Sequence, residues 1–325
     1  MNIFKFLGLL EGHRKEIKIT QLVKHWDEVV EKHKANKLFG VQIKRDGVCS
    51  LTVVKGSEVA IFSRTGRRFT NTENLVRRLK DLELPDGVYM GEIWVSKSVA
   101  SLEQLSGMVN PNRIKSLDFA SSEIVSSLKL SFFDLVSIED FIKGASDLPF
   151  SKRYNRLYLR FNMAKGLGAG MDVLDVVHPT GVEGIVFSLK AATDGGEEGV
   201  VIRNLEAGWE AGHKGWRVMK MVRGIDYDLK CIGWEEGTGK YESKVANLIF
   251  QWRGKETIKA MLGKGWTHDM AGQMFRDIQR NDTSYDSYHP LGKIFQVYAL
   301  EESSKGKLRL PKVGEARFDK DKSDV

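Results

Sequence analysis

Apolar residues follow two different periods along this chain of 325 residues. In residues 1–36 they recur at helical spacing, which predicts an amphipathic helical segment that packs on its domain. The residues that carry this pattern are Leu22, Val23, Trp26, Val29 and Val30. From residue 38 onward, short apolar runs separated by turn signals predict strands, and longer periodic runs predict helices. Strands are expected over 39–43, 51–54, 59–62, 88–95, 128–136 and 199–202, and helices over 72–82, 153–165 and 181–192.

A polar, glycine-containing segment at 223–228 marks a candidate domain boundary. Beyond it the pattern becomes strand-like, with glycine-rich turns and one expected helix over 269–277. The strands are expected over 229–234, 248–252, 294–300 and 308–310. Several short strands in so short a segment favour a small barrel such as an OB-fold. The charged tail 319–325 is expected to fray.

Charge and cysteine usage narrow the class of protein. The formal net charge of +7 suits a polyanionic partner such as nucleic acid, although a basic surface without a special ligand would give the same value. Cys49 and Cys231 lie far apart and outside any CxxC motif, so neither a zinc module nor a disulfide framework is implied. No run has the features of a signal peptide or the length of a membrane span. We therefore expect a cytoplasmic protein, or one of the host cytoplasm if the chain is viral, with no membrane partner.

Lys44 ends a short apolar strand and precedes the charged turn 45–47. Because side chains alternate across a strand, Lys44 is expected to share one face with Gln42 and Asp46. A neutral lysine amine can attack phosphorus, form a phosphoramidate and expel pyrophosphate. A surface lysine beside a turn would give the same short pattern, so this motif alone does not decide.

Two downstream glutamates fit a metal site at the ends of strands. Glu92 follows a glycine in an apolar run, and Glu198 directly precedes the strand that starts at Gly199. Paired carboxylates beside a phosphate suit a hard divalent cation, and Glu198 is preferred to the neighbouring Glu197 because it adjoins the glycine. An aromatic at Phe133 could stack on a base or pack in the core. Candidates for contacts to phosphate or ribose oxygens are Arg64, Arg203 and Lys220.

The order of these motifs resembles the covalent nucleotidyltransferases, and most closely the small ATP-dependent DNA ligases of bacteriophage type. The resemblance spans roughly residues 38–320. Its motifs are Lys44-Arg45-Asp46-Gly47, Ser63-Arg64-Thr65-Gly66, Gly91-Glu92, Phe133-Asp134-Leu135, Glu198-Gly199-Val200-Val201-Ile202-Arg203, Trp216-Arg217-Val218-Met219-Lys220, Leu308-Arg309-Leu310-Pro311 and Arg317-Phe318-Asp319-Lys320.

The resemblance implies an α+β fold, with an adenylation (nucleotidyltransferase) domain of antiparallel sheets over 1–224 and an OB-fold barrel over 225–325. It also implies that a monomer seals nicks in duplex DNA, using ATP and Mg²⁺ or Mn²⁺. Lys44 would carry AMP, and Glu92 and Glu198 would hold the metal. The implied nucleotide contacts are Gln42, Ile43, Arg64, Glu92, Phe133 and Lys220 in the first domain and Arg317 and Lys320 in the second.

Four positions depart from the family pattern. Gln42 replaces a glutamate that reads the adenine amino group, but its carbonyl can still accept that hydrogen bond. Cys49 replaces an arginine, whose contact Arg45 or Arg64 could supply instead. Val218 stands where the last motif has a lysine, and Met90 where an aspartate is frequent.

Other functions share parts of this pattern. An RNA ligase or an mRNA-capping guanylyltransferase would use the same lysine chemistry, the latter forming a covalent GMP adduct. A non-catalytic nucleic-acid-binding relative would keep the fold without the activity. The basic residues expected to contact DNA phosphates are Lys240, Lys244, Arg253 and Lys255.

Overall fold

The computed structural model divides into two compact units, Met1–Val222 and Arg223–Val325, which we describe separately. It describes residues 1–10, 12–13, 18–35, 37–163, 170–263, 265–284, 286–299, 302–303 and 306–325. None of the helices in these ranges combines the length and the apolar character that a membrane span requires.

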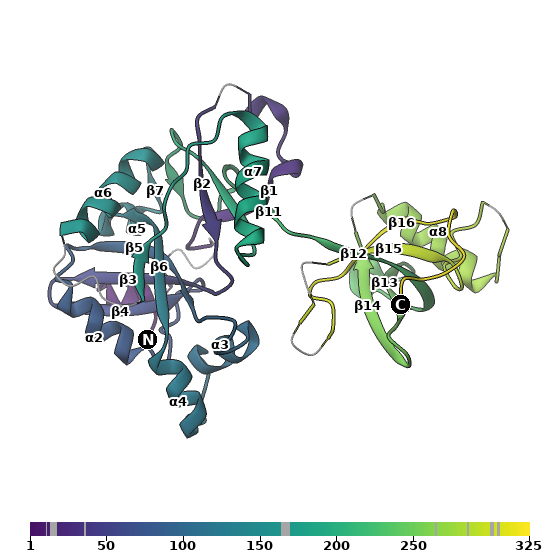
Figure 1. Ribbon diagram of the computed structural model, residues 1–325, viewed down its shortest axis with the longest axis horizontal. Helices are drawn as coiled ribbons and strands as arrows, with labels where there is room; N and C mark the ends of the chain where they lie inside the picture. Colours follow the sequence, from purple (N-terminus) through teal and green to yellow (C-terminus); the bar gives the residue numbers. More distant parts are fainter. Residues whose placement is uncertain are drawn as a thin grey trace. The chain divides into compact units, whose positions relative to one another are not determined.

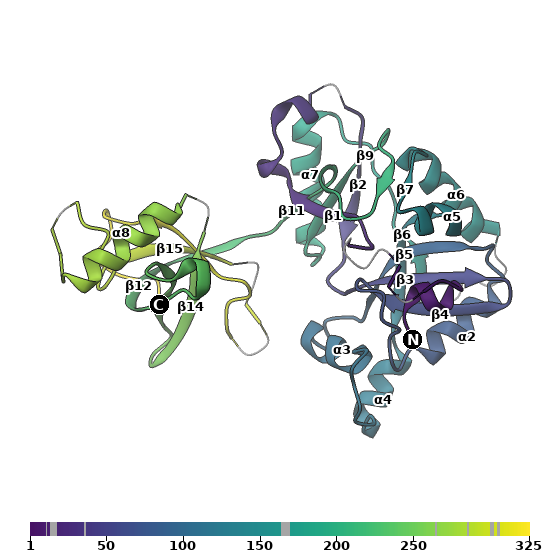
Figure 2. The same cartoon turned by 180° about the vertical axis from the view of Figure 1, so that it is seen from behind.

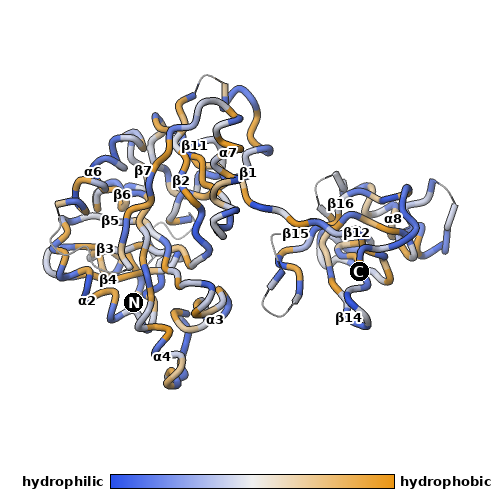
Figure 3. Tube along the Cα trace, in the orientation of Figure 1, coloured by the Kyte–Doolittle hydropathy of each residue, from blue (hydrophilic) through white to orange (hydrophobic). Residues whose placement is uncertain are grey.

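A five-stranded sheet forms the larger half of unit 1 (Figures 1 and 2). Its strands are antiparallel, except that the last pair is parallel. In spatial order they are β4 (Glu58–Ser63), β3 (Val48–Lys55), β5 (Gly87–Trp94), β6 (Lys129–Val136) and β8 (Met171–Val173). Both faces of the sheet are covered, which explains why its strands are nearly continuous apolar runs, seen as orange stretches in Figure 3.

Helices supply the cover on the two faces of this sheet. One face packs against α2 (Glu73–Asp81), α3 (Leu102–Val109), α4 (Phe119–Ser126) and α6 (Phe150–Met163). The other packs against α1 (Ile3–Phe6) and α5 (Ile138–Lys143). A two-stranded ribbon of β7 (Ala145–Ser146) and β10 (Trp209–Glu210) completes this side. The helices expected over 72–82 and 153–165 are found as α2 and α6, although residues 164 and 165 lie outside the described ranges.

A four-stranded sheet forms the rest of unit 1. In spatial order its strands are β1 (Leu22–His25), β11 (Lys214–Val222), β9 (Gly199–Asn204) and β2 (Phe39–Lys44). Helix α7 (Gly181–Asp194) packs on this sheet through Ile185 and Ala192 (Figure 1). This sheet positions three of the charged residues singled out from the sequence. Lys44 lies on β2, Lys220 lies on β11, and Glu198 directly precedes β9.

The helix predicted over 1–36 is wrong. The segment instead contains α1, strand β1 and two 3₁₀ turns, η1 (Trp26–Glu28) and η2 (Glu31–His33); residues 11, 14–17 and 36 lie outside the described ranges. Strand β1 pairs in parallel with β11 of the distant segment 214–222. Val29 is buried under the same sheet and Trp26 packs beside it, whereas Val30 is exposed, so these residues do not form one helical face.

Unit 2 is a closed five-stranded barrel, as the OB-fold prediction requires. Around the barrel its strands are β12 (Ile225–Glu236), β13 (Val245–Trp252), β14 (Glu256–Leu262), β16 (Lys312–Ala316) and β15 (Ile294–Ala299). Helix α8 (His268–Gln279) packs on the barrel core through Met274, and the turn η3 (Gly239–Tyr241) joins β12 to β13. The α+β fold with a C-terminal barrel is therefore confirmed.

Two details of unit 2 differ from the sequence prediction. The strand expected over 308–310 is absent: Leu308 makes an isolated bridge, Leu310 has a φ of 51°, and β16 begins at Lys312. The tail does not fray at its end, because Asp324 N donates a 2.8 Å hydrogen bond to the carbonyl oxygen of Asp228.

Candidate active site

Lys44 is the last residue of β2 and lies opposite Gly199 of β9. Its Nζ forms an ion pair with the Glu198 carboxylate, and 22% of the Lys44 side chain is exposed. The backbone holds the same two residues together, because Glu198 N donates a 3.2 Å hydrogen bond to the Lys44 carbonyl oxygen. The amine is thus fixed beside a carboxylate and remains reachable from solvent.

Two glycines allow the strands to approach closely at this site. A Cβ on Gly199 would lie 2.3 Å from the Met221 carbonyl oxygen, so β9 could not stay against β11 with a larger residue. A Cβ on Gly47 would lie 2.4 Å from the Ile93 carbonyl oxygen. The glycines in the lysine and Glu198 motifs therefore set the distances between the strands that carry the charged groups.

Glu92 lies in the middle of the charged cluster. It stands opposite Cys49 on β3, and burial raises the pKa of its carboxyl group to about 8. Lys44 opposes this pKa rise, whereas Glu198 reinforces it. Glu92 thus lies within β5 rather than at its end, and these mutual effects place both glutamates and the lysine, distant in sequence, in one cluster.

We expect Glu92→Gln to flatten the pH dependence of stability. The folded pKa of about 8 lies above the ordinary value of 4.5, so the folded chain binds more protons than the unfolded chain between these values. The stabilisation is complete below pH 4.5 and is lost as the pH rises to about 8. Urea unfolding across this range, with chelator, should show a steeper decline for wild type than for Glu92→Gln. The exposed Glu58→Gln should follow wild type; parallel curves for all three proteins would contradict the assignment.

Cys49 occupies the position where the family pattern has an arginine. Burial raises the pKa of its thiol to about 12, so it carries no charge near neutral pH. Glu92 adds to this rise, and Arg64 and Lys44 oppose it. Arg64, exposed in the loop after β4, is therefore close enough to act on Cys49 and Glu92, whereas Arg45 is engaged elsewhere.

Both the oxygen and the nitrogen of the Gln42 side-chain amide form hydrogen bonds within the protein. Its Oε1 accepts a 2.6 Å hydrogen bond from Arg203 Nε, and its Nε2 donates at 3.1 Å to the Leu174 carbonyl oxygen. A glutamate could accept from Arg203 but could not donate to Leu174. The guanidinium of Arg203 also lies 4.9 Å from the ring centre of the half-buried Phe133. Ile43, in contrast, turns toward the apolar cluster of the four-stranded sheet.

A buried ionic network supports this corner of the site. Asp134 is fully buried and accepts hydrogen bonds from Arg153 Nε at 2.9 Å and Arg153 Nη2 at 3.0 Å. Arg203 Nη1 lies 3.7 Å from the same carboxylate. Arg153 also donates to the Ala207 carbonyl oxygen at 3.2 Å. The network links β6, α6 and β9 next to Phe133, which precedes Asp134 in β6.

Arg153→Ala should lower the free energy of unfolding by about 3–5 kcal/mol, because it leaves the Asp134 carboxylate buried with one partner removed. Chemical denaturation measures the loss. Lys190→Ala is the control, because it removes an ion pair between Lys190 and Asp194, whose side chains are 72% and 63% exposed. It should lower the free energy of unfolding by less than about 1 kcal/mol. Equal losses in the two variants would show that the buried network is not a structural support.

Lys220 extends the cluster on β11. Burial lowers the pKa of its amine, and nearby Lys44 lowers it further. Its partner across the β1–β11 ladder is His25, whose pKa is also lowered, by burial and then by Lys220. The N-terminal segment thus places a weakly basic imidazole beside a lysine expected to contact phosphate.

The two neighbouring glutamates take different partners. Glu198 pairs with Lys44, whereas Glu197 pairs with Arg45. The Arg45 guanidinium lies 4.3 Å from the ring centre of Trp94, and Lys129 Nζ lies 4.8 Å from it. Arg45 is therefore held in a cation–π arrangement of its own.

Arg317 and Lys320 belong to unit 2, where both pair with the buried Asp228. Arg317 Nη1 lies 2.8 Å from Asp228, and Arg317 also donates to Asp319 from Nε at 2.9 Å and Nη2 at 2.8 Å. Of the basic residues expected at DNA, Arg253 pairs with Glu302 and Lys240 lies over the Tyr241 ring. The Arg317–Asp228 pairing does not follow from the spacing of the two residues along the chain.

Three residues of unit 1 that contact the candidate site, Arg153, Trp94 and His25, were not singled out from the sequence. Arg153 resembles any helix arginine, and Trp94 any strand aromatic, until the fold shows their partners. The one available signal for Trp94 was its spacing two residues after Glu92, which puts both on one face of β5. His25 was hidden by the incorrect helix prediction.

Comparison with known proteins identifies the class to which this fold and cluster belong. Residues 18–221 match the family model of the ATP dependent DNA ligase domain, and this match covers more than half of the chain. The chain therefore belongs to the ATP-dependent DNA ligase domain family.

Named relatives agree with the family. A probable DNA ligase of Streptomyces avermitilis is 27% identical over 234 residues, which cover 69% of this chain and 43% of the relative. A probable DNA ligase of an Anaeromyxobacter species is 29% identical over 226 residues, covering 68% and 41%. The chain spans less than half the length of these curated relatives.

Solved structures share the fold. The structure named Pmar-Lig_PreS3 superposes with a TM-score of 0.73 at 21% identity, covering 93% of this chain and 68% of the other. A structure from an analysis of Lig E DNA ligases gives 0.64 at 16% identity and covers 92% and 98%. The ATP-dependent DNA ligase of bacteriophage T7, in complex with ATP, gives 0.52 at 15% identity and covers 93% and 100%.

Proposed function

We propose that this protein is an ATP-dependent DNA ligase that seals nicks between a 5′-phosphate and a 3′-hydroxyl in duplex DNA. The observation that carries the proposal is the placement of Lys44. Its amine is reachable, is paired with Glu198, and lies in one cluster with Glu92 and Lys220, within a chain of the ligase family. The adenylation domain would be residues 1–224 and the OB-fold domain 225–325.

The chemistry proceeds in three transfers. Lys44 Nζ, after losing a proton to solvent, attacks the α-phosphorus of ATP; an N–P bond forms and pyrophosphate leaves. An oxygen of the DNA 5′-phosphate then attacks the same phosphorus, and the P–N bond breaks to return the lysine. Finally the 3′-hydroxyl loses its proton and attacks the 5′-phosphorus, which seals the strand and releases AMP.

The surrounding residues take supporting roles in these steps. Phe133 offers a ring face to adenine while Arg203 holds its other side, since the guanidinium lies over the ring. Gln42 positions Arg203 through its 2.6 Å hydrogen bond. Arg64 and Lys220 bind phosphate oxygens, and the peptide at Ile43 borders the nucleotide. Arg317 and Lys320 orient pyrophosphate in the first step only.

The donor set of Glu92 and Glu198 fits a divalent cation. Among the residues that the structure describes, no group of three or more His, Cys, Asp or Glu side chains forms a complete metal site. Mg²⁺ commonly uses one or two carboxylates together with water and substrate phosphates, so two glutamates suffice. Burial, reinforced by the nearby Glu198, raises the pKa of Glu92, and a cation bound at this carboxyl group would favour its ionised form. Mg²⁺ or Mn²⁺ bound here would neutralise phosphate charge.

Incubation with α-labelled ATP or GTP and Mg²⁺, followed by a denaturing gel, tests the proposal. A label from ATP that survives denaturation, and that moves to nicked duplex DNA, is the expected result. A label from GTP alone would indicate a capping-type guanylyltransferase, and no label would indicate a non-catalytic relative. Joining of a nick in RNA in preference to DNA would indicate an RNA ligase. The proposal also includes that the protein is a monomer in solution and that it acts in DNA replication, repair and recombination.

A further inference from the structure

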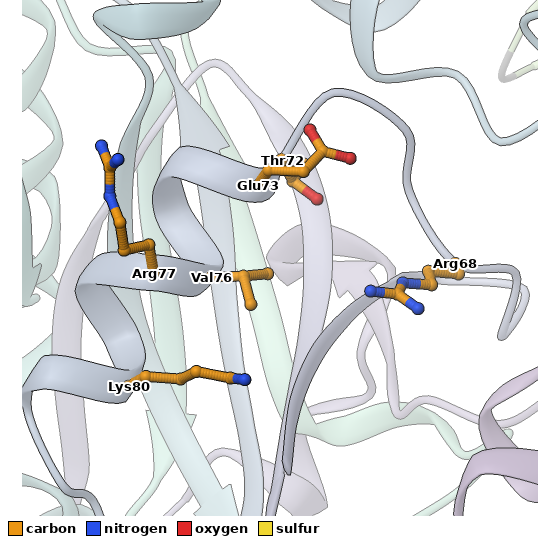
Figure 4. Close-up of a pocket in the computed structure, with 6 residues that line it drawn as sticks. All are labelled: Arg68, Thr72, Glu73, Val76, Arg77 and Lys80. Atoms are coloured by element: carbon orange, nitrogen blue, oxygen red, sulfur yellow. The ribbon is translucent and has the colours of Figure 1, made fainter. Parts of the chain in front are cut away.

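A hollow of about 290 Å³ lies beside α2, among residues that the proposed reaction does not use. It is lined by Arg68, Thr72, Glu73, Val76, Arg77 and Lys80 (Figure 4). Figure 4 shows the Arg68 and Lys80 side chains extending toward each other, Arg68 from the segment after β4 and Lys80 from the helix.

The hollow carries a clear excess of positive charge. Three cations line it against one carboxylate, that of Glu73. Arg77 Nη2 donates a 2.9 Å hydrogen bond to Asn74 Oδ1, which leaves its charge uncompensated. Within the described ranges, no ion pair engages the side chain of Arg68 or Lys80. Arg68 and Lys80 therefore face the hollow without an ion-pair partner among the residues that the structure describes.

The lining selects the chemical class of ligand. Pockets that bind whole small molecules are lined mostly by apolar side chains and have volumes of about 300–1,000 Å³. This hollow is at the lower end of that range, and Val76 is the single aliphatic side chain in its lining. Two guanidinium groups and an ammonium are the donors that recognise phosphate oxygens. The hollow therefore fits one phosphate group better than a complete nucleotide.

The position of Arg68 along the chain connects the hollow to the proposed site. Strand β4 ends at Ser63, Arg64 follows toward Glu92 and Cys49, and the chain then turns back so that Arg68 pairs with Phe62. The same turn thus presents one arginine to the reaction centre and another to the hollow. A duplex engaged by Arg64 has further backbone phosphates on either side of the nick.

We propose that this hollow binds a backbone phosphate of the duplex away from the nick, and so adds a contact that is independent of sequence. The inference rests on the proposed function, because it takes nicked DNA as the ligand. It adds a second anchor that the nucleotide chemistry does not require.

The test measures the affinity of Arg68→Gln/Lys80→Gln for a fluorescent nicked duplex over a series of KCl concentrations. Each lost phosphate contact should lower the slope of log K against log[salt] by about 0.9, with weaker binding at low salt. Lys152→Gln/Arg156→Gln removes the same charge from the exposed surface of α6 and should leave the slope unchanged. Glu73→Gln removes the one carboxylate of the hollow and should strengthen binding.

Labelled ATP separates failure of this inference from failure of the proposed function. The double variant should form the covalent adduct at the wild-type rate. Wild-type protein that forms no adduct overturns the proposed function itself. Normal adduct formation together with an unchanged salt slope in Arg68→Gln/Lys80→Gln overturns only the hollow as a DNA contact. A further outcome is that inorganic phosphate stabilises wild type but not the double variant, while the two proteins bind DNA with the same affinity. That result would assign the hollow to a free anion and would also overturn the proposal.

Discussion

Lys44→Ala is expected to lose covalent AMP labelling by at least about 10⁴-fold, the scale observed when a covalent nucleophile is removed. The expectation follows from the geometry, because Lys44 is the lysine whose Nζ is paired with Glu198 and whose backbone is fixed against the same residue. Lys220 cannot replace it, since Lys220 projects from β11, two strands away in the same sheet. A denaturing gel with α-labelled ATP measures the loss.

Lys44→Arg is the matched control for this prediction. It keeps a cation next to Glu198, but a guanidinium is not deprotonated in proteins and cannot attack phosphorus. We therefore expect a folded protein without labelling, and a labelled adduct in either variant would contradict the role of Lys44. Both variants should still seal a nick that already carries the 5′-adenylate, because that step does not use the lysine as a nucleophile. Loss of sealing as well would point to damage of the whole site.

The strands that carry the site were predictable because their signals are local. Apolar runs and a glycine turn located β2, β3 and β4, and Gly47 and Gly199, each close to a charged residue of a motif, lie where strands approach closely. The N-terminal segment failed for the opposite reason. Leu22 and Val23 pair with a strand that lies about 190 residues away, and no local period encodes that pairing.

The interior of the site could not be predicted from motif spacing. Gln42 was expected to face adenine, whereas it binds Arg203 and the Leu174 carbonyl oxygen, groups more than 130 residues away. The choice of glutamine over glutamate follows from that second partner, which needs an N–H donor. Similarly, Asp134 was read as the neighbour of Phe133 in a motif, but its role depends on Arg153. Such contacts emerge only once the sheets are assembled.

Arg317→Ala should slow formation of the lysyl-AMP adduct by about 10²-fold, the effect of removing one donor from a developing anion. Sealing of a pre-adenylated nick should change little, because no pyrophosphate leaves in that step. In the structure Arg317 is held by Asp228 and Asp319 through hydrogen bonds of 2.8–2.9 Å. Single-turnover assays of the two steps separate the effects.

Lys322→Ala provides the matched control, since it removes an exposed cation from the same tail. We expect it to leave both steps unchanged, and equal losses for Arg317→Ala in both steps would refute a role confined to the first. Asp228→Asn tests the competition directly. If the buried carboxylate holds Arg317 and Lys320 away from the departing pyrophosphate, removing its charge should accelerate adduct formation. If it instead presents the two cations in the geometry that pyrophosphate needs, the same substitution should slow the adduct step as Arg317→Ala does. The direction of that change therefore decides whether Asp228 restrains the pair or preorganises it.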